Sequence, residues 1–279
     1  MRKLFCALVL FAMIVPSLAQ TVRRFPMYPS GPWTPTTPSG LKQWLKADTG
    51  TFQASSCTTA ASADTDPVGC WQDQSGQGNN VTQSTSGKRP LLKLAIQNGK
   101  QVLQFDGSDD AFNDTLAVSG QMSFFIVYKV ASLSSGNSAE LFTLKNTTFS
   151  ELLIINSVAG YTTVSFINDL AGSQTGVGYN PVFDSNWHIL IATYNGGTNT
   201  STGSYTITFD GVSRTVVSSS TFARTGTDVG GIGSRINNSG TSSFTLNGYI
   251  AEMGVYSTAL SAGDVTNLTS YLDTRWAVY

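Results

Sequence analysis

The chain has 279 residues, of which 41% are hydrophobic and only 12% are charged. Its 16 Lys and Arg residues nearly balance its 17 Asp and Glu residues, and no run of like charge occurs, so the sequence offers no basic stripe to a nucleic-acid backbone. The length suffices for one large domain or two small ones, and sparse charge with abundant Ser and Thr is typical of half-exposed strands and polar turns.

Residues 1–19 have the pattern of a secretory signal peptide. Arg2 and Lys3 precede an apolar run over residues 4–15, and small residues follow at 17 and 19, which predicts cleavage after Ala19. No other segment approaches the roughly 18 apolar residues of a membrane span. We therefore expect a secreted or periplasmic protein that does not span a membrane and that loses Cys6 with its signal.

Residues 20–40 are expected to form an extended linker before the domain at residues 41–279. Its prolines recur at every third position: Pro26, Pro29, Pro32, Pro35 and Pro38. Polyproline II has three residues per turn, so this spacing predicts a stiff rod. The rod is interpreted as a spacer or, alternatively, as a docking segment for a groove or a neighbouring subunit.

Cys57 and Cys70 are the two cysteines that remain after cleavage. An even pair in an oxidising compartment predicts a disulfide. A zinc site is disfavoured because two thiolates need further nitrogen or sulfur ligands, and the chain has a single His.

The loop GCWQDQSGQGNNVTQ, residues 69–83, is rich in Gly, Asn and Asp. A phosphate-binding loop leads into a helix, but no helical pattern follows here. Two hypotheses remain for Asp73 and Asn79. They could bind calcium, which prefers carboxylate and amide oxygens, as the protein's one cofactor, or they could only form Asx turns.

Period-two alternation of β-branched and aromatic residues dominates the rest of the chain. Such runs occupy residues 122–130, 151–157, 162–168, 187–195, 205–211 and 244–257. With no helical segments between them, they predict an all-β, two-sheet sandwich.

One helix is expected at the C-terminal end, over residues 261–276. Ser261 is placed to cap it, with Asp264 three residues on, and the apolar residues that follow recur at helical spacing: Val265, Leu268, Leu272 and Trp276. This helix should fold back onto the sandwich.

Seven segments carry a family resemblance: LKQWLKADTG, VGCWQDQSGQGNN, GKRPLLK, NGKQVLQFDGSDDAF, NWHILIATYNG, YTITFDGV and FTLNGYIAEMGVYSTALSAGDV. In this order they resemble the laminin-G-like branch of the concanavalin A-like lectin/glucanase superfamily, in its bacterial secreted and phage virion versions, over residues 41–276. The resemblance implies an antiparallel jelly roll with one concave sheet, whose loops often carry glycans or calcium.

Catalysis is not expected, and we name no catalytic residue. Retaining glycoside hydrolysis needs two carboxylates about 5 Å apart, as alternate positions of one strand provide, and Glu140, Glu151 and Glu252 have no second Glu nearby. The acidic FDGSDD segment is interpreted as a turn. His188 is expected to be a partly buried, hydrogen-bonded structural residue.

Three classes of function remain. We favour a secreted, non-catalytic carbohydrate-binding module that uses exposed aromatic and amide groups. A structural or adhesive surface or virion protein with a protein partner is the alternative, and a glycoside hydrolase is the third class. The glycan class and the oligomeric state are not indicated by the sequence.

Overall fold

The computed structural model describes residues 32–118, 120–132, 138–145, 154–158, 161–170, 173–179, 185–196, 203–218, 229–236 and 242–279. The signal peptide, its cleavage point and linker residues 20–31 lie outside the described residues. A compact unit extends from Trp33 to Tyr279. Within the described part of the chain, no helix has the length and apolar character that crossing a membrane requires.

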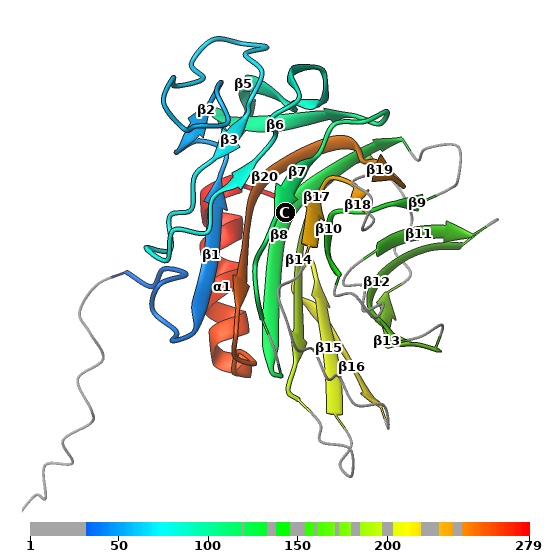
Figure 1. Ribbon diagram of the computed structural model, residues 1–279. Coiled ribbons are helices and arrows are strands. Elements are labelled where there is room, and N and C mark those ends of the chain that lie inside the picture. Colours follow the sequence, from blue (N-terminus) through cyan, green and yellow to red (C-terminus); the bar gives the residue numbers. More distant parts are fainter. Residues whose placement is uncertain are drawn as a thin grey trace, which may run out of the picture. The chain divides into compact units, whose positions relative to one another are not determined.

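The unit contains two main antiparallel sheets (Figure 1). The larger sheet has the spatial order β16 (Val212–Ser218), β15 (Gly203–Phe209), β14 (Trp187–Tyr194), β8 (Met122–Ser132), β20 (Asn247–Tyr256), β6 (Lys100–Asp106) and β5 (Leu91–Gln97), with β1 (Leu41–Lys46) also paired to β20. The second sheet has the order β10 (Phe142–Lys145), β17 (Val229–Ile232), β7 (Phe112–Asp114), β4 (Val81–Thr82), β3 (Cys70–Trp71) and β2 (Thr51–Phe52).

Two smaller antiparallel sheets complete the described strands. One has the order β13 (Ser173–Tyr179), β12 (Tyr161–Leu170), β11 (Ile154–Val158) and β9 (Ser138–Ala139), and the other pairs β18 (Arg235–Ile236) with β19 (Ser242–Ser243). A short 3-10 turn, η1, covers Ser86–Lys88. The predicted all-β sandwich with one C-terminal helix is confirmed.

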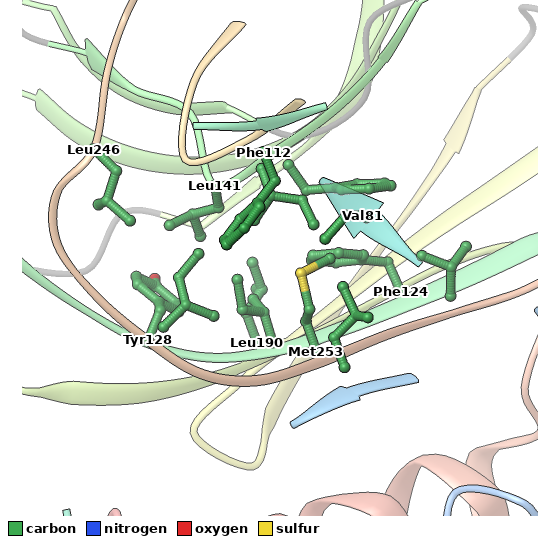
Figure 2. Close-up of a cluster of buried hydrophobic side chains, with 14 of the residues drawn as sticks. Val81, Phe112, Phe124, Tyr128, Leu141, Leu190, Leu246 and Met253 are labelled. Atoms are coloured by element: carbon green, nitrogen blue, oxygen red, sulfur yellow. The ribbon is translucent and has the colours of Figure 1, made fainter. Parts of the chain in front are cut away.

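The main core lies between the two large sheets (Figure 2). Phe124 of β8 stacks on Phe142 of β10 with ring centroids 5.0 Å apart, and Leu190 of β14 and Met253 of β20 are fully buried beside them. Alternate residues of each strand supply these side chains, because successive side chains of a strand point to opposite faces. One face of each of these strands therefore packs into the main core.

A second apolar cluster covers the other face of the larger sheet. Helix α1 (Ala262–Trp276) buries Leu268, Leu272 and Trp276 against residues such as Phe125 and Val127 of β8. Strand β8 is thus buried on both faces, which accounts for its almost continuous apolar run. The predicted cap is confirmed, since the Ser261 side chain accepts a hydrogen bond from the Asp264 amide.

The compact unit begins earlier than the predicted boundary at Leu41. Trp33 packs on Tyr271 of α1 with ring centroids 6.2 Å apart, and the Tyr256 hydroxyl donates a 2.7 Å hydrogen bond to the Pro35 carbonyl. The Thr37 amide donates to the Thr34 carbonyl, so the chain turns here and does not continue as the expected rod. Aromatic burial outweighs the local preference of the prolines for an extended rod.

The predicted disulfide is confirmed. Cys57 and Cys70 are bonded, with Cα atoms 5.3 Å apart. Cys70 lies in β3 and is fully buried. The bond links the segment that contains Cys57 to strand β3 of the second sheet.

Candidate functional site

The loop after β3 is organised around the Asp73 carboxylate. Its Oδ1 accepts hydrogen bonds from the backbone amides of Trp44, at 2.9 Å, and Ser75, at 2.8 Å. Its Oδ2 accepts from the Ser75 hydroxyl, at 2.7 Å, and the Asn79 amide, at 2.9 Å. An ionised carboxylate offers about four lone-pair sites, so donors of the protein use all of them.

Asn79 is engaged in the same loop. Its side-chain amide donates to the Lys42 carbonyl at 2.7 Å, and its backbone carbonyl accepts from the Gln43 side chain at 2.9 Å. A calcium ion needs six to eight oxygen ligands that are not occupied by donors. Asp73 and Asn79 therefore do not fit a calcium ion in this arrangement, and the geometry favours the Asx-turn hypothesis.

We expect the thermal midpoint of the folded protein to be the same in calcium and in chelator, because the Asp73 oxygens are occupied by donors. A calcium ion bound only to the folded state would add about 2.7 kcal/mol at a hundredfold excess over Kd. Differential scanning fluorimetry on the parent and on Asp73→Asn is the measurement. A calcium-dependent rise in the parent that vanishes in Asp73→Asn would instead establish the metal site.

The acidic FDGSDD segment is a turn, as expected. Asp106 Oδ1 accepts hydrogen bonds from the amides of Ser108, Asp109 and Asp110, and Asp110 Oδ2 accepts from the Asp106 amide. The three carboxylates cluster together, and burial followed by the charge of Asp106 raises the pKa of Asp110 to about 7. The cluster is explained by turn formation, so we assign it no ligand.

Asp114 in β7 is a buried carboxyl, with 2% of its surface exposed. Burial raises its pKa to about 6, and the nearby charge of Asp73 acts in the same direction, whereas hydrogen bonds from the Gln43 side chain and two backbone amides oppose the shift. The folded protein therefore holds a proton on Asp114 at pH values where the unfolded chain has released it.

The free energy of unfolding is expected to fall as pH rises from about 4 to 6. In that window the folded state binds more protons than the unfolded state, so stability declines with pH. The shift from 3.8 to about 6 is roughly two units, or about 3 kcal/mol. In urea melts, the free energy of unfolding of Asp114→Asn should decline less than that of the parent as pH rises through this window. The decline that remains in the variant should include the contribution of Asp110. An unchanged pH profile in the variant would contradict the assignment.

His188 is partly buried and hydrogen-bonded, as expected. Its Nδ1 lies 2.7 Å from Asp210 Oδ2, and its ring centroid is 4.7 Å from that of Phe209. The other Asp210 oxygen accepts from the Ile189 amide at 2.8 Å. The pair therefore joins β14 to the turn after β15.

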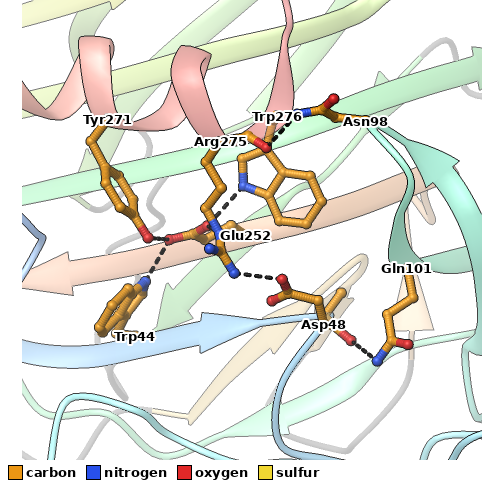
Figure 3. Close-up of polar contacts among 9 residues, drawn as sticks. Trp44, Asp48, Asn98, Gln101, Glu252, Tyr271, Arg275 and Trp276 are labelled. Carbon is orange, nitrogen blue, oxygen red and sulfur yellow. Dashed lines mark hydrogen bonds and ion pairs between the residues drawn. The ribbon is translucent and has the colours of Figure 1, made fainter.

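Glu252 is fully buried at the centre of a polar network between β20, β1 and α1 (Figure 3). The indole N–H groups of Trp44 and Trp276 each donate to it at 2.7 Å, and the Tyr271 hydroxyl donates at 3.1 Å. Arg275 Nε lies 3.0 Å from its Oε2. Each of these contacts stabilises the charged form of Glu252. The network attaches helix α1 to the larger sheet.

A groove of about 570 Å³ lies between α1 and strands β14, β15 and β16. This volume is in the range of small-ligand sites. We call it the hydroxyl groove, and its lining residues are Thr193, Thr206, Thr208, Gly211, Ser213, Thr215, Leu260, Ala262, Val265, Thr266, Thr269, Ser270, Asp273 and Tyr279.

Strand alternation directs the hydroxyls of β15 into this groove. Tyr205, Ile207 and Phe209 are buried in the main core, so the intervening Thr206 and Thr208 lie on the opposite face, where α1 packs. The YTITF pattern therefore places two threonines on the groove side.

Cross-strand pairs arrange these hydroxyls in two rows. Thr206 Oγ1 lies 2.8 Å from Thr215 Oγ1, and Thr208 Oγ1 lies 2.7 Å from Ser213 Oγ; both pairs are in register between β15 and β16. Because a hydroxyl has one proton and two lone pairs, each pair keeps one proton and further lone pairs for a ligand. The sheet wall can both donate and accept hydrogen bonds.

An exposed aromatic residue lies at one side of the groove. Tyr279 is 60% exposed, and its backbone is fixed because Asp273 Oδ1 accepts from the amides of Val278 and Tyr279, both at 3.0 Å. Gly211 contributes by lacking a side chain, since a Cβ there would lie 3.3 Å from the Tyr279 hydroxyl oxygen. A flat aromatic ring beside rows of hydroxyls suits a polyhydroxylated ligand.

Sequence reasoning missed the hydroxyl groove. Two signals could have located its walls: the alternation in YTITF, which puts Thr206 and Thr208 on one face, and the helical spacing of Ala262, Thr266 and Ser270. The missing information was that α1 docks beside β15 and β16, which no local pattern specifies. Asp73 and Asn79, the predicted site residues, do not line the groove.

Neither a family model nor a curated protein matches the chain. Solved structures do match its fold. The receptor-binding domain of botulinum neurotoxin mosaic serotype C/D aligns with a TM-score of 0.55 at 11% identity, over 83% of this chain and 51% of that chain. A structure of botulinum neurotoxin type C, whose cell entry depends on two ganglioside molecules, aligns with a TM-score of 0.55 at 12% identity, over 84% and 51%.

The CBM40 of the Ruminococcus gnavus IT-sialidase, bound to α2,6-sialyllactose, aligns with a TM-score of 0.46 at 17% identity, over 63% of this chain and 99% of that chain. The present chain spans about half of each toxin structure, 51% in both cases. At these identities the toxin structures show the sandwich fold and nothing about the ligand of this chain.

Proposed function

We propose that this protein is a secreted, lectin-like, non-catalytic carbohydrate-binding module of the laminin-G-like type, and that the hydroxyl groove is its glycan site. The observation that carries the proposal is the groove itself, a space of about 570 Å³ lined by paired hydroxyls and an exposed tyrosine. Neutral sugars offer no charge for tight pairing, so affinity has to come from preformed stacking surfaces and hydrogen-bonding groups.

The carboxylates of the described residues support a non-catalytic role. Glu252 and Glu140 are buried in ion pairs with Arg275 and Arg235, which suits them to holding the structure together. Hydrolysis requires a proton donor and a second carboxylate on either side of a glycosidic bond. Among the described residues that line the groove, Asp273 carries the one side-chain carboxyl, and it already accepts two backbone hydrogen bonds.

The test is glycan binding by the secreted protein, with adjacent substitutions on the exposed side of α1. Thr266 lines the groove, whereas its exposed neighbour Asn267 does not. Thr266→Trp should fill the groove and reduce affinity at least tenfold, because the indole occupies the ligand volume. Asn267→Trp adds the same side chain to the same helix and should bind as the parent does.

A glycan array followed by isothermal titration calorimetry on the parent and both variants is the measurement. The proposal is contradicted if no glycan binds, or if Thr266→Trp and Asn267→Trp bind alike. Both variants should keep the parent's melting temperature within a few degrees, since both sites are exposed.

A further inference from the structure

Asp273 is the single charged side chain among the described residues that line the hydroxyl groove. Among the described residues that line it there is no Lys, Arg or His, and Asp273 carries the one side-chain carboxyl. Partial burial raises the pKa of Tyr279, and the charges of Asp273 and Asp210 raise it further. Two acidic side chains therefore act on the exposed tyrosine.

The cations that are close in sequence to the groove are directed elsewhere. Arg275, two residues after Asp273 on α1, forms ion pairs with Asp48 and Glu252. Arg214 lies between Ser213 and Thr215 on β16, so strand alternation turns it to the opposite face. His188 forms a pair with Asp210. None of these three residues lines the groove.

An anionic glycan in the groove would place its carboxylate or sulfate beside Asp273, and no described lining residue is a cation that could pair with it. Burying an uncompensated charge is costly, and a nearby like charge adds repulsion. A neutral sugar meets no such penalty, because its hydroxyls can donate to and accept from the Thr206–Thr215 and Thr208–Ser213 pairs. The same groove thus favours one class of glycan and disfavours the other.

We propose that the hydroxyl groove selects uncharged oligosaccharides and rejects their sialylated or sulfated counterparts, through the Asp273 carboxylate and the absence of a cation among the described residues that line the groove. This inference rests on the proposed glycan-binding function and names the ligand class of that site. It makes this chain a binder of neutral sugars.

The experiment uses matched glycan pairs on the full secreted protein. An array carries each neutral oligosaccharide beside its sialylated and sulfated forms, and lactose and 3′-sialyllactose serve as one soluble pair for calorimetry at 0.15 M salt. We expect neutral members to bind at least tenfold more tightly than their anionic partners. We expect Thr266→Trp to abolish binding of the neutral members, with Asn267→Trp as the control.

Asp273→Asn tests the electrostatic cause. An asparagine oxygen can still accept from the Val278 and Tyr279 amides, so the groove wall is retained while its charge is removed. We expect neutral glycans to bind this variant within about twofold of the parent, and the deficit of the anionic partners to shrink severalfold. Added salt should also reduce that deficit in the parent, because it screens repulsion between exposed charges.

The outcomes separate the two proposals. Equal or tighter binding of sialylated or sulfated glycans that is lost in Thr266→Trp would overturn the neutral-sugar inference and leave the glycan-binding function standing. A deficit unchanged in Asp273→Asn would overturn the assigned electrostatic cause. Absence of binding to any glycan of the array would overturn the proposed function itself.

Discussion

Replacing Glu252 by alanine is expected to lower the free energy of unfolding by about 3–5 kcal/mol. Removing one partner of a buried ion pair leaves the other as an uncompensated charge, and losses of this size are typical. Here Arg275 loses its partner, and the indole N–H groups of Trp44 and Trp276 and the Tyr271 hydroxyl lose their acceptor. Urea denaturation monitored by tryptophan fluorescence is the measurement.

Two further variants separate the charge from the network. Glu252→Gln keeps one acceptor oxygen and should cost less than Glu252→Ala, because part of the hydrogen bonding is retained. Arg275→Ala should also destabilise, and the double variant should cost less than the sum of the single ones, since both remove the same interaction. A loss below about 1 kcal/mol in Glu252→Ala would contradict the structural role of the network.

Removing the disulfide is expected to lower the free energy of unfolding by about 3 kcal/mol. The bond closes a loop of sequence separation 13, and a loop of this size restricts the unfolded chain by about that amount in the chain-entropy model. The variant is Cys57→Ala with Cys70→Ala. Alanine is chosen because Cys70 is fully buried, and a serine hydroxyl there would add a desolvation penalty.

Guanidinium melts in the presence and absence of a reducing agent provide the measurement and its control. The oxidised parent should be more stable than the variant, and reduction should bring the parent to the stability of the variant while leaving the variant unchanged. Equal stability of the variant and the oxidised parent would show that the bond contributes nothing to folding.

The C-terminal helix was predictable because its signals lie close together in the sequence. The disulfide was predictable from the number of cysteines. The cap from Ser261 to the Asp264 amide spans three residues, and the buried positions Leu268, Leu272 and Trp276 recur at helical spacing. The disulfide was predicted because two cysteines remain after the expected removal of the signal peptide. Alternation likewise located six of the described strands, β8, β11, β12, β14, β15 and β20, since the side-chain period of a strand is fixed by backbone geometry.

The Asp73 loop was predictable only as two alternatives. Its composition suits either a calcium ion or an Asx turn, and the choice depends on which donors surround the carboxylate. The Trp44 amide that fills one acceptor site lies 29 residues earlier in the chain. The pairing of β1 with β20 fixes this part of β1, and no pattern within the loop itself encodes that neighbour.

The sequence by itself determined the all-β class, six of the strands, the C-terminal helix and the disulfide, because these depend on short spacings and residue counts. Only the tertiary structure decided the Glu252 network and the hydroxyl groove. Trp44 and Glu252 are separated by 208 residues, and the groove exists because α1 docks beside β15 and β16. Such contacts depend on which strands pair and where the helix packs, and those choices minimise the free energy of the whole chain.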